Sequence, residues 1–326
     1  MIASARSTGP IRRTVTIITT IIGLFSGALA LGGWIPDNWQ CDLISHFRLV
    51  FALILGISIA VLLLMRAFPF AAMVACLLAV NTAPLLSMYM KGSPAPEPDK
   101  PVSLSILNFN TEFQHNDNYK PFIDLVAERN PDIIALVEVD RKWIEALEPA
   151  TRAYPHRKIE LTGPGMALFS KLPIESYEVS YFGKYHHPRM KLTLRCGDRS
   201  INAIIAHPTT PKSELGFRER TTEMGLIADE LASMDNPRLL IGDLNCSPWS
   251  PAFAVFREAA LRDSQNGFGP QPTWPARTGR LIEGIPVPPL VPIDHVLVSS
   301  GILVLDRHVG PPVGSDHLPV FVTLAF

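Results

Sequence analysis

Apolar residues dominate the first 90 positions of the chain, where three long hydrophobic runs are separated by short polar stretches. A helix needs about 20 apolar residues to cross a bilayer, within a range of about 17–25. We therefore predict three transmembrane helices, at residues 14–34, 49–65 and 68–90. Two other interpretations stay open at this point: the first run could be a signal peptide, or the runs could form a buried helical hairpin in a soluble protein.

The basic residues of this region predict an orientation. Arg6, Arg12 and Arg13 precede the first run, and Arg66 lies between the second and third. The loop at residues 35–47 contains two Asp residues and no Lys or Arg. Because loops rich in Lys and Arg stay in the cytoplasm, we expect a cytoplasmic N-terminus. Three crossings then place the C-terminal part outside the cytoplasm, attached to the cell (inner) membrane.

A proline-rich stretch, KGSPAPEPDK at residues 91–100, follows the last run. Such linkers are extended and semi-rigid, so we expect it to lift the following domain off the membrane surface. Residues 101–326 are enough for a substantial hydrophobic core. The predicted organisation is a membrane region (1–90), a linker (91–100) and a catalytic domain (101–326).

Within this domain, short apolar runs alternate with segments of helical spacing. Helices are predicted at residues 119–129, 141–147 and 213–234. Strands are predicted at residues 102–109, 131–139, 165–174, 190–195, 201–206, 239–241, 293–298, 302–307 and 318–324. Several neighbouring strands are close enough in sequence to pair antiparallel. The pattern predicts an α/β fold in which two sheets form a sandwich with helices outside.

The net charge and the cysteine content limit the classes of function that the chain can have. The 326-residue chain carries a net charge of −1, so it shows no overall basic signal for nucleic acid. Its four cysteines, Cys41, Cys76, Cys196 and Cys246, lack metal-binding spacing. We expect free buried thiols, although an oxidising compartment would permit a Cys196–Cys246 bridge.

Polar residues interrupt the predicted strands at their ends. They are Asn110, Glu138, His207, Asp243, Asn245, Asp294, Asp316 and His317. Most of them, taken singly, are typical of turns, helix caps or exposed loops. Asp294 differs, because it lies within the apolar stretch VPIDHVLVS, where a buried carboxylate needs a partner.

Three of these residues suit a metal. Asn110, Glu138 and Asp316 offer hard oxygen ligands of the kind that Mg²⁺, Mn²⁺ or Ca²⁺ prefer over zinc. We therefore predict a site for a divalent cation, with Mg²⁺ as the expected ion.

The other five suit hydrolysis of a phosphate ester. Asp243 can orient and deprotonate a water, and the amide of Asn245 can hold a phosphate oxygen. His207 and His317 can donate hydrogen bonds to phosphate oxygens as negative charge develops. Asp294 can fix the tautomer of His317 and raise its pKa. Together with the metal, this set describes attack of water on a phosphoester.

The ordered segments LNFNT, PDIIALVEVD, GMALFSKLPI, IIAHPTTP, IGDLNCSP, PIDHVLVS and GSDHLPV resemble the endonuclease/exonuclease/phosphatase superfamily. That superfamily includes pancreatic-type deoxyribonucleases, apurinic endonucleases, neutral sphingomyelinases and inositol polyphosphate 5-phosphatases, and the three hydrophobic runs are similar to its membrane-attached bacterial members. The resemblance implies a four-layer α/β/β/α sandwich and Mg²⁺-dependent hydrolysis without a covalent intermediate. Ala206 and Pro208 depart from the usual neighbours of the motif histidine.

The motifs leave the substrate open, because fold and catalytic core do not select it. One hypothesis is an extracytoplasmic nuclease or phosphodiesterase acting on nucleic acid. A second is a phospholipid or sphingolipid phosphodiesterase or phosphatase, which the anchoring in a lipid bilayer favours. A third, of another class, is a membrane-tethered binding protein with a catalytically dead core.

Overall fold

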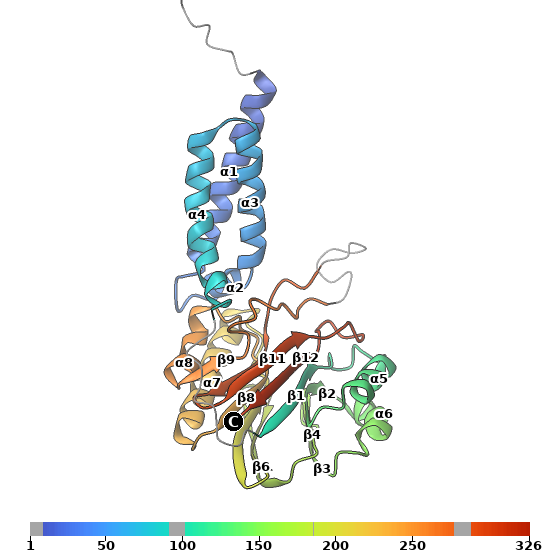
Figure 1. The fold of residues 1–326 in the computed structure, drawn as a ribbon. Coiled ribbons are helices and arrows are strands. Elements are labelled where there is room, and N and C mark those ends of the chain that lie inside the picture. Colours follow the sequence, from blue (N-terminus) through green and yellow to red (C-terminus); the bar gives the residue numbers. More distant parts are fainter. Residues whose placement is uncertain (1–8, 91–101, 185, 277–287) are drawn as a thin grey trace, which may run out of the picture.

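The computed structural model of the protein describes residues 9–90, 102–184, 186–276 and 288–326. Helices α1 (Pro10–Gly32), α3 (Arg48–Leu64) and α4 (Phe68–Ser87) form an elongated bundle, and the short α2 (Trp39–Ser45) lies at its foot (Figure 1). The three long helices coincide with the three predicted apolar runs, with ends that differ by a few residues. The predicted linker at residues 91–100 lies outside the described residues.

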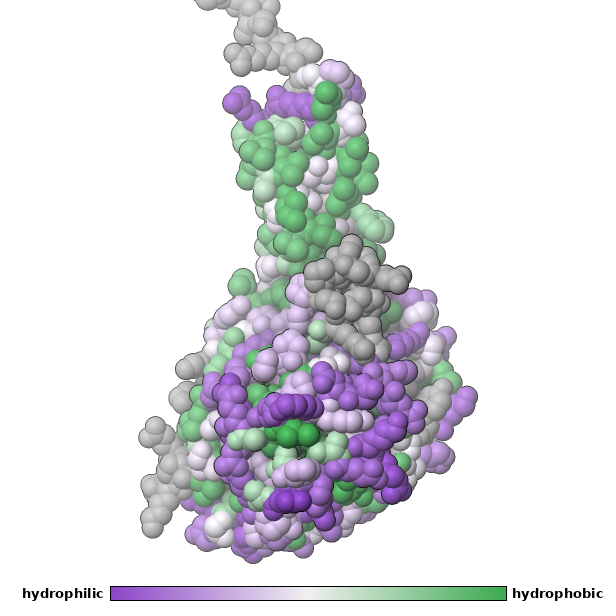
Figure 2. Space-filling view, turned by 90° about the vertical axis from the view of Figure 1, so that its right-hand side faces the viewer, coloured by the Kyte–Doolittle hydropathy of each residue, from purple (hydrophilic) through white to green (hydrophobic). Residues whose placement is uncertain are grey.

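The bundle has the length and composition of a membrane anchor. Within the described ranges, α1 and α4 are each long and apolar enough to cross a bilayer. A third span results if α2 and α3, which meet at a bend of 65°, count as one. Figure 2 shows apolar side chains over the bundle surface and mainly hydrophilic ones over the larger domain below it.

The larger domain contains two six-stranded sheets. The first has the order β11 (Leu303–Val309), β12 (Val320–Ala325), β1 (Ser103–Asn110), β2 (Ile133–Val139), β4 (Gly165–Ser170) and β3 (His156–Glu160). The second has the order β5 (Ile174–Phe182), β6 (His187–Cys196), β7 (Arg199–Ala206), β8 (Arg238–Asp243), β10 (Asp294–Ser299) and β9 (Leu261–Asp263). In each sheet one pair of neighbours is parallel, β1 with β2 and β7 with β8, and the other pairs are antiparallel.

Three hydrophobic clusters separate four layers. The inner faces of the two sheets pack together through residues such as Ile106, Leu192 and Val322. The outer face of the first sheet packs against α5 (Tyr119–Arg129) and α6 (Arg141–Thr151), and Phe122 and Trp143 lie in that cluster. The outer face of the second sheet packs against α7 (Glu214–Ser233), the turn η1 (Pro251–Phe253) and α8 (Ala254–Glu258). The predicted α/β sandwich with outer helices is confirmed.

Several elements of the structure are not predicted from the sequence. They include the strands β3, β5 and β9 and the helices α2 and α8. β3 and β5 are edge strands with half-buried or exposed residues, so their hydrophobic pattern is weak.

Cys196 and Cys246 are free thiols, because one lies between the sheets and the other beneath the outer helices. The open alternative of a bridge between them is therefore wrong.

The larger domain rests directly against the foot of the bundle, through contacts between α2 and the segments around α7 and η1. Asp42 of α2 pairs with Arg220 of α7, with 2.8 Å between Oδ2 and Nη2, and both side chains are buried. The hydroxyl of Ser250 donates to Asp42 Oδ1 at 2.6 Å, and Trp249 Nε1 donates to the carbonyl of Ser45 at 2.8 Å. The contact forms because a buried charge requires a partner, and α2 supplies it.

Replacement of Asp42 by Asn should weaken this contact. Burial raises the pKa of Asp42, but His46 and Arg220 outweigh burial and lower it to about 2, against an ordinary value of 3.8. This difference corresponds to about 2 kcal/mol of stability, since one pKa unit is about 1.4 kcal/mol. We expect the unfolding midpoint of the full chain in detergent, followed by tryptophan fluorescence at pH 7, to fall by about 4–8 °C.

The stabilisation by Asp42 depends on pH. A lowered carboxyl pKa stabilises the fold above its ordinary value and loses that effect as the pH falls through the folded value. The difference between wild type and Asp42→Asn should therefore shrink below pH 4 and vanish near pH 2. The exposed Asp37→Asn is the matched control and should change the midpoint little. Equal shifts in both variants would contradict a structural role for the Asp42–Arg220 pair.

Candidate functional site

The sandwich brings the polar strand ends together at one edge. Asn110 ends β1, and Glu138 lies near the end of the parallel neighbour β2. His207 follows β7, and Asp243 ends its parallel neighbour β8. Asp294 begins β10 opposite Asp243, because β8 and β10 are antiparallel and these two residues are paired in register. All these side chains except Glu138 are buried.

An extra residue in β2 directs Glu138 into the site. Val137 pairs with Met166 and Val139 with Gly165, so Glu138 is unpaired in a β-bulge. Its φ is 58°, a left-handed conformation that costs a non-glycine residue about 1–3 kcal/mol. Bulges of this kind commonly redirect a side chain beside a functional site. Here the bulge presents the carboxylate of Glu138 to the ends of the neighbouring strands.

The carboxylate of Glu138 accepts three hydrogen bonds. Its Oε1 lies 3.0 Å from His207 Nε2 and 3.1 Å from Asn110 Nδ2, and its Oε2 accepts the backbone N–H of Phe113 at 3.0 Å. Burial raises the pKa of Glu138, but the hydrogen bond and charge of His207 outweigh it and lower the pKa far below 4.5. The carboxylate is therefore ionised.

A close strand contact positions Asp243. The preceding Gly242 has a φ of 147°, and a Cβ atom there would lie 1.9 Å from the carbonyl oxygen of Ala206. Only glycine lets β8 approach the end of β7 this closely. Asp243 follows with Oδ1 accepting the backbone N–H of Asn245 at 2.8 Å and Oδ2 accepting Asn110 Nδ2 at 3.0 Å.

Asp243 belongs to two groups of convergent side chains. One group contains Glu138, His207 and Asp243, and the other contains Asp243, Asp294 and His317. In each group the candidate ligand atoms lie within 4.8 Å of one another. Burial raises the pKa of Asp243, the charge of His317 opposes this, and the charge of Asp294 adds to it, with a net increase. Asp243 is therefore a more basic carboxylate than an exposed one.

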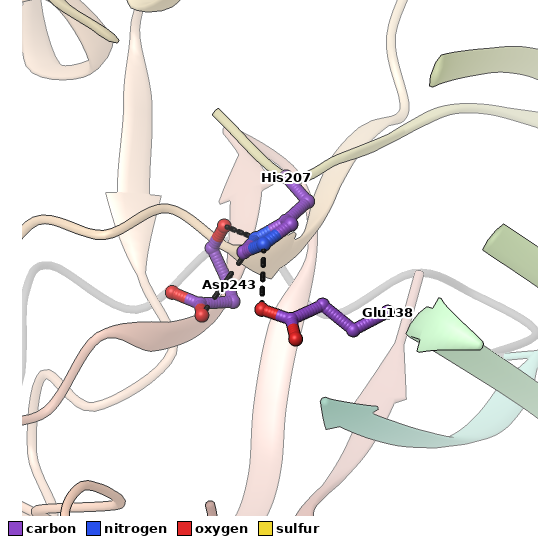
Figure 3. Close-up of side chains that lie close together, drawn as sticks. All are labelled: Glu138, His207 and Asp243. Atoms are coloured by element: carbon purple, nitrogen blue, oxygen red, sulfur yellow. Dashed lines mark hydrogen bonds and ion pairs between the residues drawn. The ribbon is translucent and has the colours of Figure 1, made fainter. Parts of the chain in front are cut away.

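His207 lies between two carboxylates (Figure 3). Its Nε2 donates to Glu138 Oε1 at 3.0 Å, and its Nδ1 donates to the carbonyl of Asp243 at 3.2 Å. Burial lowers the pKa of His207, but Glu138 and Asp243 outweigh burial and raise it to about 9. The imidazole is therefore protonated at neutral pH, so both ring nitrogens act as donors.

His317 and Asp294 form the second arm. Asp294 Oδ2 accepts His317 Nδ1 at 2.8 Å, and His317 Nε2 lies 3.7 Å from Asp243 Oδ2. Burial lowers the pKa of His317, but the charges of Asp294 and Asp243 raise it to about 10. The expected contact between Asp294 and His317 is thus present, and it directs Nε2 toward Asp243.

Asn245 and Asp316 lie at the same cavity but make other contacts. Asn245, with a φ of 48°, donates one amide hydrogen to the carbonyl of Pro208 at 3.0 Å. Asp316 Oδ2 accepts Trp274 Nε1 at 3.0 Å, and its backbone N–H donates to Glu112. Asp316 lies outside both convergent groups found among the described residues.

The donor set fits a divalent cation. Two carboxylates, Glu138 and Asp243, converge with imidazole nitrogens within 4.8 Å, and each carboxylate oxygen has more than one lone pair. Asn110 presents its amide nitrogen to both carboxylates, while its oxygen accepts the backbone N–H of Glu112 at 2.9 Å. Of the three predicted ligands, the structure therefore brings Asn110 and Glu138 into contact, and it places Asp316 elsewhere on the cavity wall.

Several residues of the site carry no sequence signal of their own. The hydroxyl of Ser315 accepts the N–H of His317 at 3.0 Å and donates to the carbonyl of Asn110 at 2.8 Å, so it joins the last motif to β1. Glu112 and His115, in the loop after β1, also line the cavity. They follow the predicted Asn110 closely, and this proximity is the only signal that could have identified them. Leu43, His46 and Phe47 line the same cavity from the N-terminal region, and nothing in the sequence indicates this.

The fold is an α/β sandwich of two sheets, with a cluster of carboxylate and imidazole side chains at one edge. The sequence matches the Endonuclease/Exonuclease/phosphatase family over residues 107–317. The chain belongs to this family, as the ordered motifs predict.

Solved structures share this fold at low sequence identity. TDP2 from D. rerio in complex with a single strand DNA product is 15% identical, with a TM-score of 0.59 over 68% of this chain and 98% of that chain. An endonuclease/exonuclease/phosphatase from Beutenbergia cavernae DSM 12333 is 21% identical, with a TM-score of 0.54 over 68% of this chain and 71% of that one. A family protein from Bacteroides thetaiotaomicron is 16% identical, with a TM-score of 0.54 over 70% and 96%. A comparison with curated proteins found no match.

Proposed function

We propose that the protein is a membrane-anchored, divalent-metal-dependent phosphodiesterase that hydrolyses its substrate by direct attack of water. The observation that carries the proposal is the position of Asp243 between two imidazoles, each paired to a second carboxylate. A buried acid with raised pKa beside two cationic donors suits proton abstraction next to a developing anion. Family membership supports the same class of reaction.

Asp243 takes a proton from water while the water oxygen forms a bond to phosphorus, and the bond from phosphorus to the leaving oxygen breaks. His317 and His207, both protonated, donate hydrogen bonds to the phosphate oxygens as their charge increases. Asn245 supplies its remaining amide hydrogen, because one is already bonded to Pro208. The leaving oxygen takes up a proton from solvent, and Asp243 releases its proton to solvent, which completes the hydrolysis.

Glu138 would hold the divalent cation together with the oxygen of Asn110, which reaches the site once the amide turns away from Glu112. Asp243 lies beside Glu138, and Asp316 lines the same cavity. The cation would supply Lewis-acid stabilisation of the phosphate oxygens. Mg²⁺ is the proposed ion, since the ligands are hard oxygens. A cation bound by Glu138 would replace the hydrogen bond between Glu138 and His207 Nε2. That N–H would then be available to a phosphate oxygen of the substrate.

The proposed topology has three spans, with a cytoplasmic N-terminus and an extracytoplasmic catalytic domain. The charge pattern of the loops and the apolar bundle support it. A periplasmic phosphatase reporter fused after Phe326 should be active in cells, whereas the same reporter fused after Arg66 should be inactive. Activity of only the second fusion would contradict this topology.

Metal removal tests the proposed activity. The full chain, purified in detergent, should hydrolyse bis-p-nitrophenyl phosphate with Mg²⁺, and excess EDTA should lower the rate by at least about 10²-fold because the cation stabilises the transition state. Addition of Mg²⁺ beyond the chelator should restore the rate. Binding of Mg²⁺ without hydrolysis of this or any other phosphoester in a broad panel would favour the dead binding protein.

A further inference from the structure

The cavity above the catalytic residues has two different walls. Its volume is about 330 Å³. One wall carries the ionisable residues of the catalytic domain, including Asp243 and His317. The other wall contains Leu43, His46 and Phe47, which belong to the N-terminal region. The substrate cavity is therefore composite, because a segment of the membrane region completes it.

Buried hydrogen bonds fix the N-terminal wall against the larger domain. His46 Nδ1 accepts the backbone N–H of Ser247 at 3.3 Å and its hydroxyl at 2.8 Å. Ser247 lies two residues after Asn245, and Arg220 donates to the carbonyl of Asn245 at 2.8 Å while it pairs with Asp42. These contacts are buried. They join the segment from α2 to the loop that carries the phosphate-binding amide.

Apolar side chains form part of the cavity lining. Leu43 and Phe47 are half-buried, and Trp274, Val291 and Ile293 continue the same surface on the catalytic domain. Among the described residues lining the cavity, Lys212 is the only Lys or Arg. A nucleic-acid backbone is normally bound by several basic side chains. The wall thus favours a phosphoester whose other substituent is apolar.

The cavity lies at the end of the bundle where a bilayer surface would be. Four apolar residues around the foot of the bundle are 48–71% exposed: Trp34, Ile35, Tyr89 and Met90. Tryptophan and tyrosine are typical of the interface between lipid and water. The carbonyl of Met88 accepts the N–H groups of Gly267 and Gly269, so the catalytic domain also contacts this end of α4 (Figure 1). A bilayer that surrounds the bundle would therefore end close to the cavity.

We propose that Leu43 and Phe47 form a binding surface for the hydrocarbon part of the substrate, and that the substrate is a membrane-resident phosphodiester lipid. This inference rests on the proposed phosphodiesterase function. The phosphodiester would lie against Asp243 and His317, and the adjoining chain would lie along the N-terminal wall toward the bilayer. The membrane region then selects the substrate in addition to anchoring the enzyme.

Chromogenic diesters of different chain length test the proposal. The full chain in a fixed concentration of detergent is assayed with Mg²⁺ on methyl p-nitrophenyl phosphate, octyl p-nitrophenyl phosphate and thymidine 5′-p-nitrophenyl phosphate, below the micelle concentration of the octyl ester. We expect kcat/KM to be at least about 10-fold higher for the octyl than for the methyl ester, since each buried methylene adds affinity. The thymidine ester should be no better than the methyl ester.

Two variants locate the effect. Leu43→Ser and Phe47→Ser should each lower the octyl-to-methyl ratio of kcat/KM by several-fold. The double variant should lower this ratio by about 10-fold. Ile35→Ser, which removes an exposed apolar side chain outside the cavity, should leave the ratio unchanged. The wild-type ratio alone remains decisive if either wall variant fails to fold.

The outcomes separate this inference from the proposed function. Absence of metal-dependent turnover of every ester would contradict the phosphodiesterase function itself. Turnover of all three esters with no gain from the octyl chain, or with a preference for the thymidine ester, would overturn the lipid inference and leave the phosphodiesterase function intact. An unchanged ratio in both wall variants would also overturn it.

Discussion

Replacement of Asp243 by Asn is expected to lower kcat toward bis-p-nitrophenyl phosphate by about 10³-fold, because removal of a positioned general base typically costs 10²–10⁴-fold. Asn is nearly isosteric with Asp, and its carbonyl oxygen can still accept the backbone N–H of Asn245. The substitution removes the negative charge and the basic oxygen shared by the two convergent groups. KM should change much less than kcat, because the group acts in the transition state.

The design of this experiment needs a folding check and a matched variant. Asp124 is an exposed carboxylate on α5 that pairs with Lys120, so Asp124→Asn removes the same charge far from the cavity. That variant should retain wild-type kcat. The unfolding midpoint of Asp243→Asn should lie within a few degrees of wild type. A folded Asp243→Asn enzyme with kcat within 10-fold of wild type would exclude Asp243 as the general base.

Replacement of Asp294 by Asn should move the pH dependence of the reaction. The charges of Asp294 and Asp243 raise the pKa of His317 to about 10 against the effect of burial, so wild-type His317 stays protonated through pH 9. Without the charge and hydrogen bond of Asp294, fewer groups oppose burial, so the pKa of His317 should fall. We therefore expect kcat/KM at about pH 8.5 to decrease by at least about 10-fold, which corresponds to a pKa one unit or more below that pH.

The sign of this effect distinguishes it from simple loss of structure. The active form of His317 is the protonated one, so on the alkaline side of the profile the activity falls as the pH rises through the pKa of His317. The wild-type rate should therefore decline only near pH 10, and the Asp294→Asn rate should decline from a lower pH. At pH 6 the two enzymes should differ only a few-fold. Parallel profiles at all pH values would contradict the assigned role.

The chain contains a matched control for this variant. Asp263 pairs with His295 Nδ1 at 2.9 Å, and both side chains are buried, as are those of Asp294 and His317. This second pair lies outside the catalytic cavity. Asp263→Asn should lower the unfolding midpoint without moving the pH profile. A profile shift in this control would show that any buried carboxylate–histidine pair affects the reaction.

The sequence predicts much of the site, because the relevant signals are local. An apolar strand that ends in Asn110, Glu138, His207 or Asp243 must place that polar side chain at the strand terminus. The carboxyl ends of parallel neighbours lie at the same edge of a sheet, so the two sheets bring the four residues together. The roles assigned to them remain predictions until the variants are assayed.

Other features depend on contacts between distant segments. Asp42 and Arg220 are 178 residues apart, and no local pattern indicates that an acid in a membrane loop pairs with a catalytic-domain helix. The left-handed backbone at Glu138 arises from the register of β2 against β4, which a single strand sequence does not define. The direction of the Asn110 amide likewise depends on the surrounding Glu138, Asp243 and Glu112.

The stereochemical course at phosphorus tests direct attack by water most directly. The full chain with Mg²⁺ is given one diastereomer of methyl p-nitrophenyl phosphorothioate in ¹⁸O-labelled water, and the configuration of the labelled methyl phosphorothioate product is determined. A single in-line displacement predicts inversion, with one solvent oxygen in the product. Retention of configuration would require a covalent enzyme intermediate and would contradict the account.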